Sequence, residues 1–453
     1  MGDSVPSDRR PLTESTTEFE FMRVPKTEFP PCGWNSFDCY GLFINETQAL
    51  ANLEVFVEKL KPSGFEYFCL DGGWYSDYAF LSDPAAPINK RKAVNHIDEW
   101  GRFVPSPSRF PRGMGFLADA CHDRGVKFGL HIQRGIGRVA VERNTPVMGT
   151  NVRASDIADL SSTCPWLPFM AGVDMARPGA QAYYDSWIGL LAEWGVDFIK
   201  ADDIVAYPDE IEAVAAAIDK VERPILLSLS PGKDPFRPDW PVFERCANML
   251  RITTDIWDRN GDLTLAFSNW EKWEDYGGPS CWLDLDMIPF GALQVYAQQA
   301  SENAELSGFG TARQSLLSPA QKRTFIAQRA LASSALFFGG ELTMTPDEDF
   351  ALVTHPGLLE CNRSGRPAKR IYSRRHVDVR RKEAANRGHG YLGIFNTHIV
   401  PADVALPLDA LGFATGHPVE FVDVWTGKPV PPVQGRLLLN IEPLDVAVLK
   451  FQA

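Results

Sequence analysis

The sequence has few cysteines and no excess of positive charge. Its 453 residues carry a formal net charge of -13, which disfavours nucleic acid and anionic membranes as partners because both would repel such a surface. No two of the 8 cysteines form a CxxC pair, so we expect buried free thiols. The cysteines are scattered over the chain, at Cys32, Cys39, Cys69, Cys121, Cys164, Cys246, Cys281 and Cys361.

Long apolar runs are also missing. No stretch approaches the roughly 20 apolar residues that a membrane span needs, so the sequence predicts no membrane partner. The first residues, MGDSVPSDRRPLTESTTEFE, are polar and contain no apolar signal core. We interpret residues 1–28 as a polar lead-in, with disorder as one reading of it. We interpret the chain as cytoplasmic. A secreted protein whose signal peptide had been removed would show the same sequence features.

What the sequence does contain is an alternation of short apolar runs and amphipathic stretches between Gly33 and Phe350. Apolar runs that are short and uninterrupted are typical of parallel strands buried on both faces. Together with the length, this pattern predicts a (β/α)8 TIM barrel over residues 29–352. The expected strands cover residues 66–71, 126–132, 197–201, 225–230, 248–253 and 335–338, and the expected helices cover residues 46–60, 116–124, 180–194 and 320–334.

The pattern of apolar and polar residues changes after about residue 355. The remaining chain has few helical signals, and turn residues separate several strand-like runs at fairly regular spacing. These runs are GYLGIFN, ADVALPL, VEFVDVW, GRLLLNI and VAVLKF. They predict a small C-terminal antiparallel β-sandwich domain over residues 353–453.

Polar side chains gather at the carboxyl ends of the expected strands. In a barrel these ends face one mouth, so residues far apart in sequence converge there. A single aspartate in such a place would mean little, because turns and helix N-caps use aspartate constantly. Five strand ends of this kind predict an enzyme with an acidic mouth. The residues are Asp71, His131, Lys200, Asp202, Asp203, Ser230, Arg251 and Asp255, with Asp284 and Asp286 in the segment beyond.

Paired carboxylates at a barrel mouth suit the cleavage of glycosides. One carboxyl group protonates the leaving oxygen while the other attacks or stabilises the oxocarbenium-like centre. They equally suit a divalent cation, which takes carboxylate oxygens. Lys200 lies two residues before Asp202 on one strand face, and Arg251 is close to Asp255. These two cations disfavour the metal reading, so we expect no metal.

Several motifs make the chain similar to glycoside hydrolase family 27, the α-galactosidases and α-N-acetylgalactosaminidases. The resemblance covers residues 30–453 in order and without large gaps, which makes it far more specific than any one motif. The motifs are GWNSFDCYG (33–41), LDGGW (70–74), GRFVPSPSRFP (101–111), GMGFLADACHDRGVKFGLHI (113–132), WGVDFIKADD (194–203), RITTDI (251–256), GGPSCWLDLDM (277–287), RTFIAQRALASSALFFGGEL (323–342) and FVDVWTGK (421–428).

The resemblance implies a retaining, exo-acting α-glycosidase that hydrolyses terminal α-galactosides or α-N-acetylgalactosaminides by double displacement. This mechanism implies neither a metal nor an organic cofactor. Asp202 matches the nucleophile position and Asp255 the general acid/base. The family's sugar-binding positions fall on Trp34, Asp71, Lys200, Arg251 and Asp286. Trp74, Trp257 and Trp282 are candidates for a stacking wall, with core packing as the alternative.

The chain departs from the family pattern at its specificity positions. Gly72 stands where the second aspartate of a D-D pair recognises the axial 4-hydroxyl and the 6-hydroxyl. His131 replaces a tyrosine near the sugar. Ser230 matches the branch with α-N-acetylgalactosaminidase activity, where a serine leaves room for an acetamido group. Two roles are considered for Arg134: it contacts a charged group of the substrate, or it forms a structural salt bridge.

These departures indicate preserved chemistry with a rebuilt specificity pocket. We expect a carbohydrate or glycoconjugate as substrate and leave a homodimer open. Three alternatives remain: an α-glycosidase with another sugar specificity, a transglycosylase that delivers the same ester intermediate to a sugar, and a carbohydrate-binding barrel without turnover.

Overall fold

The computed structural model describes residues 26–79, 93–295, 311–384, 386, 388–414 and 418–453. Its larger part is built around one sheet of eight strands, all of them parallel, in the order β12-β11-β10-β9-β5-β2-β1-β15. The strands are β1 (Cys32–Asn35), β2 (Tyr67–Leu70), β5 (Lys127–Gln133), β9 (Phe198–Asp202), β10 (Leu226–Leu229), β11 (Met249–Arg251), β12 (Trp282–Asp284) and β15 (Leu336–Phe338).

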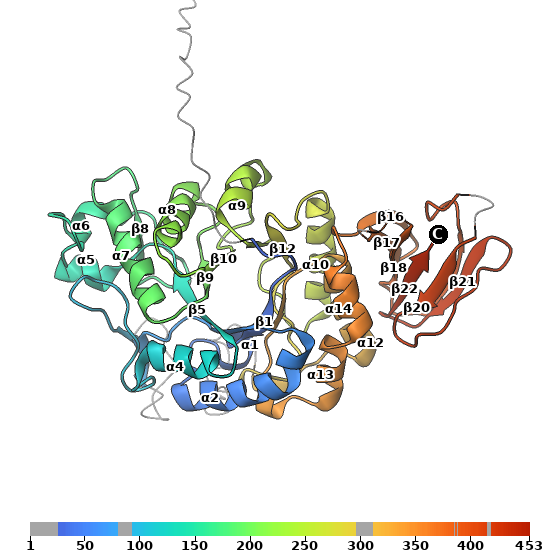
Figure 1. The fold of residues 1–453 in the computed structure, drawn as a ribbon, viewed down its shortest axis with the longest axis horizontal. Helices are drawn as coiled ribbons and strands as arrows, with labels where there is room; N and C mark the ends of the chain where they lie inside the picture. The colour runs from blue at the N-terminus through green and yellow to red at the C-terminus, as the bar shows by residue number, and fades with distance from the viewer. Residues whose placement is uncertain (1–25, 80–92, 296–310, 385, 387, 415–417) are drawn as a thin grey trace, which may run out of the picture.

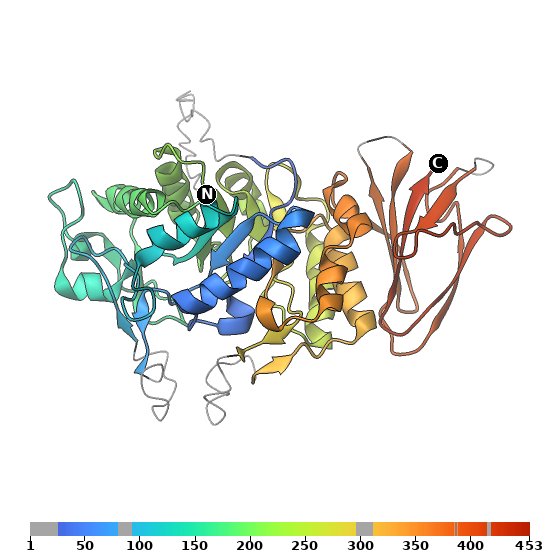
Figure 2. The same ribbon diagram turned by 60° about the horizontal axis from the view of Figure 1, so that its bottom comes forward.

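The two ends of this sheet meet and make it a barrel. The backbone N–H of Ala335, just before β15, donates to the carbonyl of Leu283 on β12 at 3.2 Å. A further parallel bridge joins Ile288 to Phe338. Helices surround the strands, as Figures 1 and 2 show from two directions. The predicted TIM barrel is confirmed.

Burial explains why these runs form strands. Every residue of β1, β2 and β10 is buried, as expected of strands covered on both faces. All six predicted strands are present, with ends that differ by one or two residues. Side chains that point inward fill the barrel, among them Tyr67, Phe198 and Phe337. The barrel interior is therefore a packed core, and only its carboxyl end is free to hold a site.

The helices begin and end largely where the sequence predicts. Two of them begin with a reciprocal capping box, Asn45 with Gln48 and Ser318 with Gln321. The expected helix 46–60 is α-helical only to Val55 and continues as a π-helical turn over Phe56–Leu60. The main barrel helices are α2 (Glu46–Val55), α4 (Gly113–His122), α7 (Ala180–Glu193), α8 (Pro208–Asp219), α9 (Trp240–Cys246), α10 (Asn260–Trp273) and α12 (Pro319–Leu331).

The long connection between β5 and α7 carries structure that the sequence reading did not find. It folds into the short helices α5 (Arg138–Arg143) and α6 (Ala154–Ile157) and a three-stranded sheet. The strands of this sheet are β6 (Ile136–Gly137), β7 (Ala158–Asp159) and β8 (Met170–Val173). The segment lies beside the barrel mouth and brings residues of the 160–169 loop to it.

The C-terminal strands form the predicted antiparallel domain. A five-stranded sheet, in the order β16-β17-β18-β22-β20, accompanies a two-stranded sheet of β19 and β21. Its own core includes Val379, Ile394, Leu437 and Leu449. The strands are β16 (Lys369–Arg374), β17 (Val377–Glu383), β18 (His389–Asn396), β19 (Ala402–Pro407), β20 (Glu420–Asp423), β21 (Arg436–Ile441) and β22 (Val446–Gln452), of which the sequence reading missed β16 and β17.

The predicted division after residue 352 falls within a helix. It lies inside α13 (Asp347–Val353), and α14 (Pro356–Arg363) follows and packs against α12 of the barrel. The first strand of the C-terminal sheet begins only at Lys369.

The N-terminal region, the cysteines and the absence of a membrane-spanning helix among the described residues can each be compared with the predictions from the sequence. Of the predicted lead-in, residues 1–25 lie outside the described residues, while the Nζ of Lys26 donates to the carbonyls of Glu244, Ala247 and Ser280. All eight cysteines are buried and free, as predicted. Within the described ranges, no helix has the length and apolar character to cross a membrane.

Candidate functional site

A pocket opens at the carboxyl ends of the barrel strands. It has a volume of about 430 Å³, within the range of small-molecule sites. Strand ends, the 160–169 loop and the loops after β10 and β11 build its wall. It is lined by Phe37, Leu42, Asp71, His131, Trp166, Leu167, Lys200, Asp202, Pro231, Gly232, Lys233, Arg251, Thr254, Asp255, Trp257 and Arg259.

Lys200 and Asp71 form a buried ion pair across the floor of the pocket. The Nζ of Lys200 lies 2.6 Å from Oδ2 of Asp71, which also accepts from Nδ2 of Asn35 at 2.8 Å. Burial raises the pKa of the Asp71 carboxyl, but the charges of Lys200 and His131 outweigh this and lower it overall. The result is a carboxylate paired with an ammonium group, both of which line the pocket.

Asp202 ends β9 beside His131. The Nε2 of His131 lies 3.5 Å from Oδ2 of Asp202, and Oδ1 accepts the backbone N–H of Asp203 at 3.0 Å. Burial disfavours ionisation, yet the hydrogen bond and charge of His131, with Lys200 and Arg251, lower the pKa of Asp202 well below its ordinary value. This carboxyl group is ionised, as a nucleophile must be.

The surroundings of Asp255 shift its pKa in the opposite direction from that of Asp202. Its Oδ1 accepts from Nη2 of Arg251 at 2.8 Å, and Nη1 of the same arginine reaches Oδ1 of Asp286 at 3.1 Å. Burial, together with the negative charges of Asp286 and Asp202, outweighs Arg251 and raises the pKa of Asp255. One carboxyl group with a lowered pKa and one with a raised pKa are the arrangement that acid–base work requires.

A second, small cavity lies under this pocket and shares Lys200 and Arg251 with it. Its volume is about 20 Å³, enough for one water molecule. Ser230, Asp284 and Asp286 line it rather than the main pocket. Burial raises the pKa of Asp284 to about 6. The Oγ of Ser230 has no hydrogen-bond partner among the described residues.

Three predicted aromatic residues do not reach the pocket. Trp34 is fully buried, stacks on Phe68 at a centroid distance of 4.5 Å and donates from Nε1 to the carbonyl of Gly340. Trp282 is the first residue of β12 and packs inside the barrel, at the amino end of its strand and away from the carboxyl ends that form the pocket. Trp74 is core, and its Nε1 donates to the carbonyl of His131. Of the predicted stacking residues only Trp257 lines the pocket.

Arg134 makes a structural salt bridge. Its side chain is buried, and it donates to Oδ2 of Asp203 at 3.1 Å and to Oε1 of Glu210 at 2.7 Å. It also donates from Nε to the carbonyl of Asp203, whose φ of 57° lies in the left-handed region. This clamp holds the backbone directly after Asp202 in a conformation that a non-glycine residue seldom adopts.

Several pocket residues were missed because loops carry no periodic pattern. Phe37 lies in the first recognised motif and Leu42 directly follows it, whereas Trp166, Lys233 and Arg259 come from irregular segments.

Gly72 lies beside Leu42 and His131 in the pocket wall. A Cβ atom there would lie 3.2 Å from Cδ2 of Leu42 and 3.2 Å from Cε1 of His131, so these two side chains fill the space beside it.

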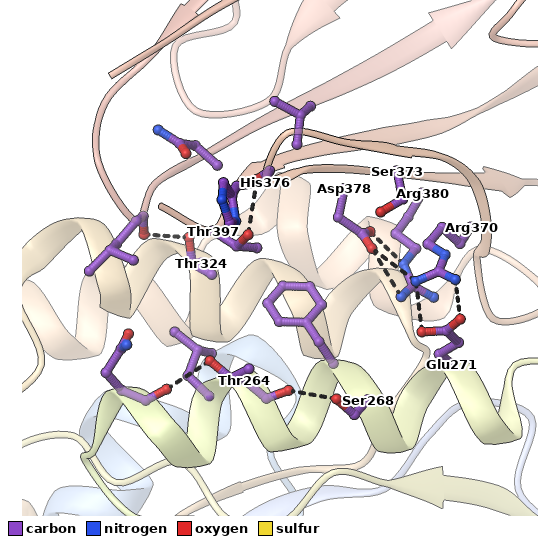
Figure 3. A pocket seen from close by; sticks show the side chains of 16 residues that line it. Thr264, Ser268, Glu271, Thr324, Arg370, Ser373, His376, Asp378, Arg380 and Thr397 are labelled. Carbon is purple, nitrogen blue, oxygen red and sulfur yellow. Dashed lines mark hydrogen bonds and ion pairs between the residues drawn. The ribbon is translucent and has the colours of Figure 1, made fainter. Parts of the chain in front are cut away.

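A separate cavity of about 190 Å³ lies between α10 and the C-terminal sheet. Figure 3 shows that its charged groups are paired with one another, Arg370 with Glu271 and Arg380 with Asp378. It contains none of the strand-end carboxylates. Within the described ranges, no cluster of three or more His, Cys, Asp and Glu side chains could hold a metal ion.

A barrel mouth with two carboxyl groups of opposed pKa, each beside a cation, defines the class of barrel glycosidases. No family model matches the chain. Among curated proteins, it is 22% identical to an α-galactosidase of Cyamopsis tetragonoloba over 91% of the chain and 84% of that protein. It is 24% identical to an α-N-acetylgalactosaminidase of Gallus gallus over 88% and 87%.

Solved structures give stronger likenesses. A β-L-arabinopyranosidase of glycoside hydrolase family 27 from Geobacillus stearothermophilus, solved with arabinose, is 36% identical with a TM-score of 0.86. The match covers 94% of this chain and 98% of that one. The chain therefore belongs to glycoside hydrolase family 27, and the predicted resemblance is confirmed. It is a retaining glycosidase of the α-galactosidase type, with low identity to the curated enzymes.

Proposed function

We propose that the chain is an exo-acting glycosidase that removes terminal β-L-arabinopyranosyl residues with retention of configuration. This sugar has the ring geometry of an α-D-galactoside and lacks the exocyclic hydroxymethyl group. Support comes from the likeness to the Geobacillus stearothermophilus β-L-arabinopyranosidase at 36% identity. The proposal agrees with an α-galactosidase-type mechanism acting on a smaller sugar.

The observation that carries the proposal is the wall beside Gly72. The family resemblance puts a carboxylate at this position, where it recognises the 4- and 6-hydroxyls. Here glycine supplies no partner, and Leu42 and His131 occupy the neighbouring space. A 6-hydroxyl placed there would lose its hydrogen bonds to water without replacing them, which costs about 1–3 kcal/mol. A sugar without that group avoids the cost.

In the proposed reaction Asp202 is the nucleophile. An Oδ atom of Asp202 forms a bond to the anomeric carbon while the bond to the leaving oxygen breaks. Asp255 gives its proton to that oxygen, and its raised pKa favours the protonated form that this role requires. In the second step Asp255 accepts a proton from water, and the water oxygen attacks the anomeric carbon from the face that the leaving group vacated. The bond to Asp202 breaks at the same time, so the two inversions give net retention.

The remaining polar residues would bind the sugar or hold these groups. We assign Asp71, Lys200, His131 and Arg251 to the sugar because all four line the pocket. Asp286 positions Arg251 through its 3.1 Å contact. We also propose that the barrel and α14 form one catalytic unit and that the C-terminal sheets carry no catalytic group.

An acetamido sugar is less well supported. The sequence motif around Ser230 favours it, but Ser230 borders a cavity of about 20 Å³, which holds a water and not an acetamido group. This cavity would have to merge with the main pocket before such a sugar could bind.

The test compares 4-nitrophenyl glycosides that differ only in the glycone. We expect kcat/KM for the β-L-arabinopyranoside to exceed that for the α-D-galactoside by about 10- to 100-fold. The α-N-acetylgalactosaminide serves as a third arm. Equal kcat/KM for arabinopyranoside and galactoside would overturn the proposal, and retention is checked by following the anomeric configuration of the first product.

A further inference from the structure

The lining of the main pocket changes from buried to exposed between its floor and its opening. Leu42, Asp71 and His131 at one end are buried, as is Arg251. The exposed lining residues are Trp166, Lys233, Thr254 and Arg259. An exo-acting pocket encloses the terminal sugar at its closed end, so the leaving group must lie among the exposed residues.

Trp166 lies at this opening, where 41% of its surface is exposed. Its ring edge packs against Gly232, where an added Cβ would lie 2.5 Å from Cη2 of the indole. The same Cβ would collide with the carboxylate of Asp203, which Arg134 clamps in place. The chain therefore passes between the carboxylate of Asp203 and the indole at Gly232, and the exposed indole offers a flat apolar face at the opening.

Lys233 follows this glycine and supplies positive charge beside the indole. It is exposed and makes no ion pair among the described residues, and its Nζ lies 5.9 Å from the ring centroid of Tyr207. The other cation of the opening, Arg259, already pairs with Asp262 at 2.7 Å. Of the two cations at the opening, Lys233 is thus the one without an ion pair among the described residues, in a protein of net charge -13.

We propose that Trp166 and Lys233 form a leaving-group subsite for a ring that carries a carboxylate. The ring stacks on the indole, and the carboxylate meets the ammonium group. This inference rests on the proposed function, because it describes the other side of the same scissile bond. A uronic acid residue and an aromatic acid share this chemistry.

The ring contact is tested with substrates that differ only in the leaving group. For Trp166→Ala we expect kcat/KM on the 4-nitrophenyl glycoside to fall about 10-fold, while the methyl glycoside, which has no ring to stack, is cleaved as by the wild type. Trp166→Phe retains a ring face and should lose less. An equal loss on both substrates would show a merely structural role and overturn the ring contact.

The charge contact is tested with the 4-(carboxymethyl)phenyl glycoside and its methyl ester, whose phenols have similar basicity. Lys233→Met should lower kcat/KM for the acid about 3- to 5-fold relative to the ester, and added salt should shrink the wild-type preference. Lys428→Met, at an exposed lysine of the C-terminal domain, is the matched control. An unchanged acid-to-ester ratio in Lys233→Met overturns the carboxylate assignment.

A last comparison separates the two ligand sources. Disaccharides whose leaving sugar is galacturonic acid or galactose are hydrolysed by the wild type and by Lys233→Met. A preference for the uronic acid that Lys233→Met abolishes supports a saccharide, and a preference confined to the aryl acid supports an aromatic leaving group. If galactosides are cleaved and arabinopyranosides are not, the proposed function is wrong. The leaving-group subsite can still be tested in that case, with the same pairs of leaving groups attached to galactose.

Discussion

The ammonium group of Lys200 and the carboxylate of Asp71 lie 2.6 Å apart, although 129 residues separate them in the chain. β5 stands between their strands in the sheet, so the long Lys200 side chain spans one strand to reach Asp71. Removing either partner would leave a buried charge uncompensated, which typically costs 3–5 kcal/mol. The pair therefore holds the floor of the pocket together.

The two catalytic assignments can be separated by substitution. We expect Asp202→Asn to lower kcat by at least about 10⁴-fold and Asp255→Asn by about 10²–10⁴-fold, because only the first removes the group that forms the covalent ester. Steady-state kinetics on a 4-nitrophenyl glycoside measures both, with thermal melting as the check on folding. A folded Asp202→Asn variant with near-wild-type turnover would refute its role.

Added azide distinguishes the two losses. In Asp255→Ala an activated leaving group departs without acid catalysis, and azide then attacks the Asp202 ester, so activity returns with a glycosyl azide of retained configuration. In Asp202→Ala azide replaces the nucleophile itself, and the product has the opposite configuration. The reverse pattern of products would exchange the two assignments.

His131 should set the acidic limb of the pH profile. Its hydrogen bond and charge help to lower the pKa of Asp202, so removing them raises this pKa. As the pH falls, Asp202 is then protonated earlier, and activity begins to decline at a higher pH than in the wild type. His131→Phe should move the acidic limb of kcat/KM upward more than His131→Gln, which retains a donor. The basic limb reports the raised pKa of Asp255 and should stay in place. An acidic limb unmoved in His131→Phe would contradict this account.

The strand ends were predictable because strand periodicity and barrel geometry leave little freedom. Asp71, Lys200, Asp202, Arg251 and Asp255 close parallel strands or follow them, and all five line one pocket. Each position follows from the end of a short apolar run, which the sequence displays directly.

The aromatic residues and the loops were not predictable in the same way. Trp257 lines the pocket and Trp282 does not, because the first follows a strand while the second begins one. Nothing in the residue type distinguishes these cases. Trp166 and Lys233 reach the opening through irregular backbone, which obeys no period.

Leu42 should govern discrimination against the hydroxymethyl group. Shortening it in Leu42→Ala opens the space beside Gly72, so we expect kcat/KM for the α-D-galactoside to rise about 10-fold relative to the β-L-arabinopyranoside. Leu167→Ala, a substitution of another buried apolar residue of the same pocket, is the control and should leave this ratio unchanged. If both variants change the ratio equally, general loosening of the pocket explains the effect.

Lys382 connects the two domains and should make stability depend on pH. Fully buried on β17, its Nζ donates to the carbonyl of Ala330 at 3.2 Å and to Oγ of Ser333 at 2.5 Å. Burial lowers its pKa from 10.5 to about 8. The folded state thus binds fewer protons than the unfolded state between about pH 8 and 10.5.

Wild-type stability should therefore rise relative to Lys382→Met as the pH increases through this window. The cost of burying the charge is fully present below about pH 8 and disappears near pH 10.5, with a total of about 3 kcal/mol. Denaturant unfolding of both proteins at pH 7, 8, 9 and 10 measures the difference. Lys450→Met removes an exposed lysine that pairs with Glu360 and is the control. Parallel pH dependences in wild type and Lys382→Met would show that Lys382 keeps an ordinary pKa in the folded protein.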